Sequence, residues 1–492
     1  MTNRTLLALV LAATMVLAGC SGGTGAGTTA PADDTTDAET TVATSTEGTD
    51  TTQTTAGGDQ QSSVEDCESR SEDDDDIVKE SGACLGFDAD QVYRNILEMT
   101  GNTEMAKGPR VNSKSTAQTV PYSFEDFGFE TGTFQTTMGI APESTPNVYS
   151  GGNAGPTASG GVNVNLRYIS NQTSDARSPG PTQNATEAEI TAAHEFLHAM
   201  QFYKGYQNRL ARNVSQQDVH QNTRNVFTAQ LEGSAVYFEM QYQQRYMDRI
   251  TEPRSVSRWA NQSAFSMYTL GPYVMGNQYT QYRVNSTAEF EKLYDNPAVT
   301  MEQVLHNYMP NEELPKPLSV TGDVSSDWST PSSSSTKGEL FLRAALRSEL
   351  SGPKAAAGAT GWGNDGLIEF RNASYNPSGE YKTGYAWGVR LDNETEGAEF
   401  ETLFGEWLES KGSLQNGVYV AEDGQAYRLV ERSEETYVVL AGHETFVTQA
   451  VVSGNTTEVV IEHTSEDQTQ GDSVEDGEEA VAAGSVSVRP LA

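Results

Sequence analysis

The string His194-Glu195-Phe196-Leu197-His198 limits what this chain can fold into more than any other part of its sequence. It lies within residues 189–201, which contain no Gly or Pro and are predicted to form a helix. Residues four apart share one face of a helix, so both imidazoles can reach a single metal ion. Glu195 directly follows the first imidazole, where its carboxylate can take a proton from metal-bound water. The string therefore predicts a helix that holds a metal ion beside a general base.

The sequence around this string favours a metal site over coincidence. Only 6 His occur among 492 residues, so a chance match is expected in roughly 0.5 % of such chains. Thr186 and Glu189 have the spacing of a capping box, which predicts that the helix begins at Thr186. Ile190, Ala193 and Leu197 give the helix an apolar flank beside the imidazoles. The ordinary alternative is a pair of core or surface histidines.

A metal site of this kind needs a third protein ligand and an open fourth position. Two carboxylates in the predicted helix 227–246 are candidates, Glu232 and Glu239, which lie seven residues apart on one helix face. Glu232 is preferred, because Gly233 and Ala235 leave room for close helix packing near the metal. Glu239 is then expected to support a ligand from outside the coordination sphere or to lie in solvent.

These segments resemble the zincin metallopeptidases. The step Glu232-Gly233-Ser234-Ala235 resembles the gluzincin branch, in which a second helix supplies a glutamate as the third ligand. Gluzincin-like proteins with a His-Ala-x-Gln continuation match His198-Ala199-Met200-Gln201. The metzincin branch would need a third His soon after the second, and residues 199–210 lack that pattern. His220 remains another possible ligand, although its polar surroundings favour a connection between helices.

The resemblance implies a zinc-dependent peptidase that acts on peptide or protein substrates. Carried over to this chain, the Zn²⁺ ligands are His194, His198 and Glu232, and the general base is Glu195. Bound zinc lowers the pKa of a water molecule to about 7, which makes hydroxide available near neutral pH. Tyr237 is a candidate donor to the oxyanion that develops during the attack.

A second interpretation is a zincin-like surface lipoprotein that has lost activity and works as a binding or envelope-structural module. Glu195 argues against this interpretation, because an inactive site has no reason to keep a general base. Metal binding without hydrolysis of any peptide would favour the inactive module.

The resemblance implies an α+β fold with a zincin-like core in residues 83–330 and a smaller α/β C-terminal unit in residues 331–463. Zincins place an edge strand beside the metal helix. Residues 162–169 alternate apolar and polar side chains, which predicts a strand, and the resemblance suggests that this strand is the edge strand and binds the substrate.

The C-terminal unit is predicted to contain an amphipathic helix at Glu339–Leu350 and a second helix at Ala398–Lys411. Between them, Trp362-Gly363-Asn364-Asp365 resembles a segment that accompanies zincin-like cores in secreted proteins and precedes a short strand pair. Trp362 and Trp387 are expected to be buried against the preceding helix rather than to bind a ligand.

The first residues predict an exported, lipid-anchored protein. Residues 1–19 have a basic start and an apolar stretch too short to span a bilayer, and Leu17-Ala18-Gly19-Cys20 resembles a lipobox. Cleavage before Cys20 would leave lipid on its thiol and the chain at the outer face of the cytoplasmic membrane. Residues 20–82 and 464–492 are acidic and poor in large apolar side chains, so both are predicted to be disordered.

Covalent features fit an exported protein. Cys67 and Cys84 are predicted to form a disulfide, with two free thiols as the alternative. The candidate glycosylation sites are the sequon asparagines Asn171, Asn213, Asn261, Asn285, Asn372, Asn393 and Asn455. The Asn184 sequon is not counted among these candidates, because Asn184 lies almost at the start of the predicted metal helix in the sequence.

The net charge of the chain indicates the kind of environment in which the protein works. Lys and Arg number 31 against 68 Asp and Glu, which gives a net charge of −37. Such dispersed acidity is typical of extreme halophiles, whose surface charges are screened by molar salt. Nucleic acid is excluded as a partner because there is no basic patch to neutralise phosphates. The whole chain resembles haloarchaeal surface lipoproteins with a zincin-like core.

Overall fold

The structure is a computed structural model of the 492-residue chain. The described residues are 75–82, 84–114, 133–141, 149–154, 161–170, 184–214, 221–248, 255–324, 328–330, 334–375 and 381–463. They form an α+β fold, as predicted. Among them, no helix has both the length and the apolar character that crossing a membrane requires. The predicted signal sequence and acidic tail lie outside the described residues.

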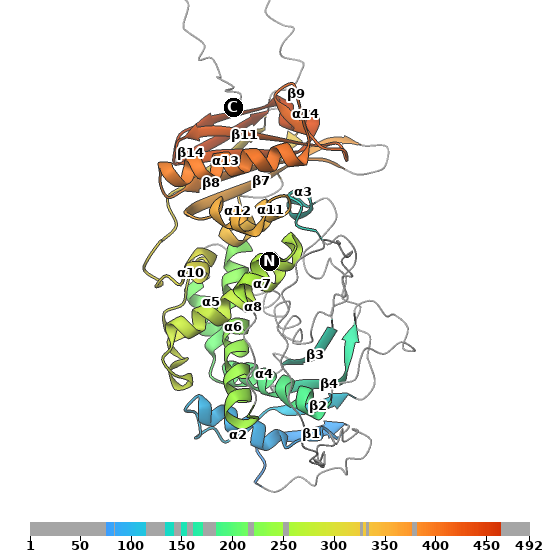
Figure 1. Cartoon of the computed structure of the whole chain (residues 1–492), viewed down its shortest axis with the longest axis vertical. Coiled ribbons are helices and arrows are strands. Elements are labelled where there is room, and N and C mark those ends of the chain that lie inside the picture. The colour runs from blue at the N-terminus through green and yellow to red at the C-terminus, as the bar shows by residue number, and fades with distance from the viewer. Residues whose placement is uncertain are drawn as a thin grey trace, which may run out of the picture.

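A four-stranded sheet forms the end of the molecule that is farthest from the C-terminal unit (Figure 1). Across the sheet, the strands are β1 (Lys79–Gly82), β2 (Arg110–Lys114), β4 (Gly161–Ser170) and β3 (Tyr149–Ala154). The first three run parallel, and β3 runs antiparallel to β4. The strand predicted at residues 162–169 is confirmed as β4. Its predicted place at the edge is wrong, because β2 and β3 pair with its two sides.

The folded part begins earlier than predicted. β1 lies within residues 20–82, the stretch expected to be a disordered tether. Two features hold it in place: β1 pairs with β2, and the adjoining Val78 is only 2 % exposed. The polar sequence of β1 gives no apolar pattern from which this strand could be predicted.

Helix α4 (Ala185–Tyr203) carries the string from His194 to His198 and lies against β3 and β4, while α2 (Ala89–Met99) lies against α4. A capping box starts α4: the Asn184 side chain accepts from the Glu187 amide, and the Glu187 carboxylate accepts from the Asn184 amide. The box therefore begins two residues before the predicted Thr186. Both pairs have the required spacing, and Asn is as good a first residue as Thr.

The rest of this unit is helical. Its helices are α5 (Tyr206–Val214), α6 (Gln221–Tyr246), α7 (Val256–Ala260), α8 (Ala264–Arg283), the 3-10 turn η3 (Thr287–Glu289), α9 (Lys292–Asp295) and α10 (Met301–His306). α6 and α8 cross at two glycines, Gly233 and Gly276. A Cβ on Gly233 would lie 2.2 Å from the Gly276 carbonyl carbon, and one on Gly276 would lie 2.1 Å from the Ala229 oxygen. Only glycine allows the two backbones to approach this closely.

The C-terminal unit is built on a seven-stranded sheet in which every neighbouring pair is antiparallel. Its order is β6 (Trp328–Ser329), β7 (Trp362–Tyr375), β8 (Tyr381–Leu391), β12 (Thr436–His443), β11 (Gln425–Ser433), β10 (Val418–Val420) and β9 (Ser413–Gln415). Three helices contribute to one side: α11 (Glu339–Arg347), α12 (Gly352–Ala357) and α13 (Glu394–Lys411). The helices predicted at 339–350 and 398–411 are confirmed.

The opposite face of this sheet is also covered. It contacts α14 (Glu444–Gln449) and a small sheet of β13 (Ala450–Gly454), β14 (Glu458–His463) and β5 (Ser319–Val324). Because β5 pairs with β14, the C-terminal unit begins near Ser319 and not at the predicted residue 331. Side chains alternate along β12, with Val439 facing the helices and Val438 facing α14 and the small sheet.

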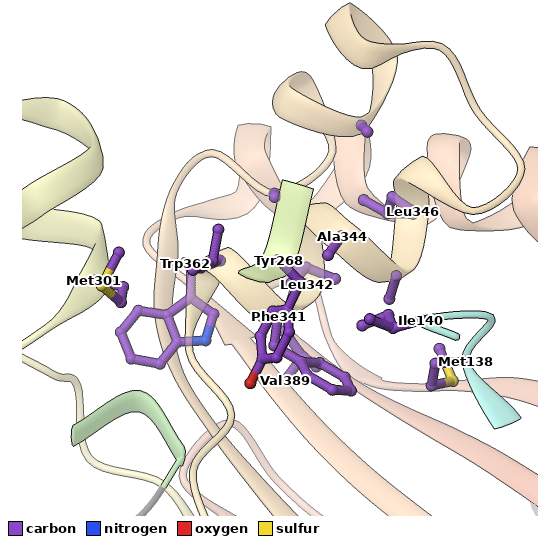
Figure 2. Close-up of a cluster of buried hydrophobic side chains, with 14 of the residues drawn as sticks. Met138, Ile140, Tyr268, Met301, Phe341, Leu342, Ala344, Leu346, Trp362 and Val389 are labelled. Carbon is purple, nitrogen blue, oxygen red and sulfur yellow. The ribbon is translucent and has the colours of Figure 1, made fainter. Parts of the chain in front are cut away.

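A segment of the first unit completes the core of the second. Helix α3 (Phe134–Thr137) comes between β2 and β3 in the chain, but it lies beside α11 and α12 (Figure 1). The Phe134 ring stacks on Phe341 with centroids 5.5 Å apart, and the Tyr427 hydroxyl donates to the Thr137 carbonyl. Figure 2 shows Ile140 and Leu346 of α11 as members of the same cluster of buried side chains.

One cluster of buried side chains therefore crosses both units, and we call it the shared core. Its members include Phe134, Met138, Ile140, Val226, Met267, Tyr268, Met275, Leu340, Phe341, Leu346, Trp362, Trp387 and Val439. The shared core joins the two units, and each unit also has a buried cluster of its own, around α2, α4 and β4 in the first and between the large sheet and α14 in the second.

The Trp362-Gly363-Asn364-Asp365 segment fixes the start of α11. Asp365 accepts hydrogen bonds of 2.7 Å from the backbone amides of Lys337 and Gly338, and one of 2.8 Å from the Trp362 ring nitrogen. Trp362 and Trp387 are fully buried, and the Trp387 ring lies edge-on to Phe341 at 5.5 Å. The predicted burial of both rings is confirmed, and for Trp387 so is the packing against α11.

Candidate metal centre

Two helices bring three ligating side chains to one point. α4 supplies His194 and His198, and α6 supplies Glu232. The two Nε2 atoms lie 3.2 Å apart, and Glu232 Oε2 lies 3.5 Å from the first and 3.3 Å from the second. All three side chains are at least 95 % buried. Of the described residues, these are the ones placed to share a metal ion.

The other nitrogen of each imidazole is occupied. His194 Nδ1 lies 3.2 Å from Glu239 Oε2, and His198 Nδ1 lies 2.8 Å from Gln201 Oε1. Both partners are acceptors, so each Nδ1 carries the proton and each Nε2 presents a lone pair. Three lone-pair atoms then face one another in a buried site. Such an arrangement is repulsive unless a cation or a proton lies between them.

The spacing fits a tetrahedral metal ion. Zinc–nitrogen and zinc–oxygen bonds of about 2.0–2.1 Å place neighbouring ligand atoms about 3.3 Å apart. The three separations in this centre, from 3.2 to 3.5 Å, bracket that value. Two imidazoles and one carboxylate are also a donor set that zinc favours. The residues present therefore fit the ion that the motif implies.

The electrostatics of the centre show how strongly it attracts positive charge. Burial opposes a charged His194, but hydrogen bonds to Glu232 and Glu239 outweigh this effect and raise the pKa of His194 to about 10. Burial likewise opposes a charged Glu232, yet His198 and His194 lower its pKa to about 2. A metal ion would take the place of the proton that the imidazoles otherwise retain.

Glu195 lies beside the ligands and is fully buried. Neither of its carboxylate oxygens makes a full hydrogen bond to a described residue. Burial raises its pKa to about 7, against the opposing effect of the two imidazoles and of a backbone contact with Ala154 at the end of β3. An unpartnered buried carboxylate beside a metal site is suited to accept a proton from water.

The other candidate residues are not part of the group formed by the three ligand side chains and Glu195. Glu239 supports His194 from outside the donor set, as predicted. His220 lies outside the described residues. Tyr237 lies edge-on to Phe238 at 5.7 Å, and the described contacts do not bring its hydroxyl to Glu195 or to a ligand. Its role as a transition-state donor stays a prediction without support from the geometry.

A buried polar group behind His198 was not predicted from the sequence. The Gln201 amide that contacts His198 also contacts Ser234 of α6 and Tyr294 of α9. Gln201 was within reach of prediction, because it follows His198 by three residues on the same helix face. Tyr294 gave no such signal, since it lies 93 residues beyond Gln201 in the chain.

The covalent features are described in part. Cys84 is disulfide-bonded, whereas Cys67 and Cys20 lie outside the described residues. Four sequon asparagines are exposed: Asn261, Asn285, Asn393 and Asn455. Asn372 is 8 % exposed on β7, and its role as a glycan site stays a prediction. Asn171 and the side chain of Asn213 fall outside the described residues.

Comparison with known proteins gives a family match to part of the C-terminal unit. Residues 329–452 match a family described as "Domain of unknown function (DUF8575)". This match spans β6 to β13 and does not include the metal centre. No curated protein and no solved structure matches the chain.

Proposed function

We propose that this protein is a zinc-dependent peptidase with a zincin-like core, in which His194, His198 and Glu232 hold the ion and Glu195 is the general base. The observation that carries the proposal is the convergence of three buried lone-pair atoms beside a buried carboxylate that makes no full hydrogen bond. A merely structural pair of histidines would not need such a carboxylate next to it.

The chemistry is divided between the ion and the chain. When bound, zinc would polarise a water molecule and the scissile carbonyl. Glu195 would accept a proton from the attacking water and pass it to the leaving amine. Its pKa of about 7 suits both steps, because the group can gain and lose a proton near neutral pH. Glu239 and Gln201 would hold the two imidazoles in orientation.

The position of β3 supports a peptide substrate. β3 is the edge strand of its sheet in the described part of the chain, and it ends at Ala154, which contacts Glu195. An extended peptide that paired with β3 would add a strand to the sheet and pass close to the general base. We place the enzyme on the cell surface in high salt, anchored by lipid on Cys20, on the basis of the lipobox and the charge of −37.

The test separates metal binding from catalysis. The folded full chain in molar salt should contain about one zinc per chain, and His194→Ala should abolish this binding. Glu195→Gln should retain the zinc and lower peptide hydrolysis by about 100-fold or more. Glu189→Gln is the matched control, since Glu189 lies on the same helix and accepts from the Tyr242 hydroxyl. Metal analysis and a mixed-peptide cleavage assay measure both properties.

Two results would reject the proposal. Absence of zinc in the folded wild-type chain would remove the metal centre. Zinc with no cleavage of any peptide in the mixture would instead favour the inactive surface module.

A further inference from the structure

A fully buried polar network joins the metal helix to two other helices. Gln201 of α4, Ser234 of α6 and Tyr294 of α9 each have no exposed surface. The Gln201 Nε2 atom lies 2.9 Å from the Tyr294 hydroxyl, 3.1 Å from Ser234 Oγ and 3.4 Å from the Leu231 carbonyl. Its Oε1 atom lies 2.8 Å from His198 Nδ1. The network therefore ends on a proposed zinc ligand.

The protons in this network can be assigned by elimination. The Leu231 carbonyl only accepts, and Ser234 donates its proton to it over 2.8 Å. Ser234 Oγ is then left to accept from the Tyr294 hydroxyl, 2.9 Å away, and from the Gln201 amide. The Tyr294 oxygen accepts the other amide proton of Gln201. Every donor in the group consequently has an acceptor.

This assignment fixes which way the Gln201 amide points. The opposite orientation would set its oxygen against the Leu231 carbonyl and its NH₂ group against His198 Nδ1. The observed orientation requires a proton on His198 Nδ1, which leaves the Nε2 lone pair free to face Glu232. This network of uncharged groups thus selects the His198 tautomer whose Nε2 lone pair can bind a metal.

We propose that Gln201, Ser234 and Tyr294 act together as positioning residues that hold His198 in its metal-binding tautomer and orientation. This inference rests on the proposed zinc site. His194 is held differently, since its partner Glu239 is a carboxylate that is 15 % exposed and is not part of the network. Tyr206 stacks on Tyr294 with centroids 4.8 Å apart and closes the network from behind. Because Gln201, Ser234 and Tyr294 have no exposed surface, they satisfy one another without contact with bulk solvent.

Two substitutions test the network in the full chain. Gln201→Met keeps the length of the side chain and removes its hydrogen bonds, and Tyr294→Phe removes one hydroxyl. Loss of a group that orients a zinc ligand typically weakens metal affinity by about 10- to 100-fold. We expect Gln201→Met to fall in that range and Tyr294→Phe to give a smaller loss. Competition with a chelator measures the zinc affinity.

Tyr279→Phe is the matched control, because Tyr279 is 1 % exposed and its hydroxyl accepts from Arg283 outside the network. It should leave zinc affinity unchanged. A second readout is the visible spectrum of the Co²⁺-substituted protein, which reports ligand geometry. It should change in Tyr294→Phe and stay the same in Tyr279→Phe.

The outcomes distinguish this inference from the proposed function. Wild-type zinc affinity in a folded Gln201→Met or Tyr294→Phe variant overturns the network, as does an equal loss in Tyr279→Phe. If Gln201→Met does not fold, the comparison of Tyr294→Phe with Tyr279→Phe decides. A wild-type chain that binds no zinc overturns both claims. Zinc binding without peptide cleavage overturns the proposed activity alone.

Discussion

At the scale of single residues, two glutamates of the centre differ in their partners and not in their burial. Glu232 is 2 % exposed and Glu195 is fully buried. Two imidazoles lie within 3.5 Å of Glu232 and lower its pKa, whereas burial raises the pKa of Glu195 to about 7. When their surroundings push the pKa values of two carboxyl groups apart, the two groups can take different chemical roles. In the proposed function, Glu232 is held as an anion for a metal and Glu195 exchanges a proton.

Zinc affinity should depend on pH in a way that follows from His194. In the metal-free centre, hydrogen bonds to Glu232 and Glu239 raise the pKa of His194 to about 10 in spite of its burial. Below that pH the imidazole holds a proton, which zinc must displace. We therefore expect apparent zinc affinity to rise between pH 6 and pH 8 by up to about tenfold per unit for each proton released.

Calorimetric titration in buffers of different ionisation enthalpy measures the released protons. Glu239→Gln removes one of the groups that raise this pKa, so it should reduce the proton release near pH 8. Zinc affinity that is independent of pH over this range would contradict the assignment of His194 as a ligand.

At the scale of helices and strands, the crossing of α6 and α8 positions Glu232. Gly276→Ala would place a methyl group 2.1 Å from the Ala229 oxygen, and that contact is with backbone. The helices must separate, which typically costs about 1–3 kcal/mol. Because Glu232 lies one residue from Gly233 at this crossing, zinc affinity should fall together with stability. Thermal unfolding and chelator competition measure the two effects.

Gly271→Ala on the same helix is the control. Its added methyl group would meet the ends of the Leu340 side chain and not backbone. A small loss of stability with unchanged zinc affinity is expected. Equal effects of the two substitutions on zinc affinity would show that the crossing does not position Glu232.

The sequence predicted elements well where the hydrophobic period or a motif was strong. The metal helix, the helix of Glu232 and the strand at residues 162–169 all follow such patterns. β3 was missed, because Tyr149-Ser150-Gly151-Gly152-Asn153-Ala154 contains two adjacent glycines and does not alternate. A register shift between Ser150 and Gly152 further breaks its pairing with β4.

At the scale of the whole molecule, the shared core could not be predicted from sequence. No local period indicates that Phe134 of the first unit meets Phe341 and Trp387 of the second. The grouping of His194, His198 and Glu232 was predictable in large part, because one motif places the two imidazoles on one helix face. The tertiary partners of α3 lie more than 200 residues away in the chain. A local stretch of sequence contains no information about such distant packing.

Phe134→Ala should therefore destabilise the C-terminal unit, although Phe134 belongs to the first unit by chain order. Its side chain is 2 % exposed, and removing a buried phenylalanine typically costs about 3–5 kcal/mol. Tryptophan fluorescence during denaturant unfolding reports this change, since Trp328, Trp362, Trp387 and Trp407 lie in the C-terminal unit. Phe134→Leu should cost less. Unchanged unfolding of the alanine variant would show that α3 is dispensable there.

The place of α3 also matters for synthesis. Thr137 leaves the ribosome 290 residues before Tyr427, the residue that donates to its carbonyl. At about 5–20 residues per second, the early segment waits roughly 15–60 s for that partner. During this interval its apolar side chains, Phe134 among them, lack the native partners that later bury them.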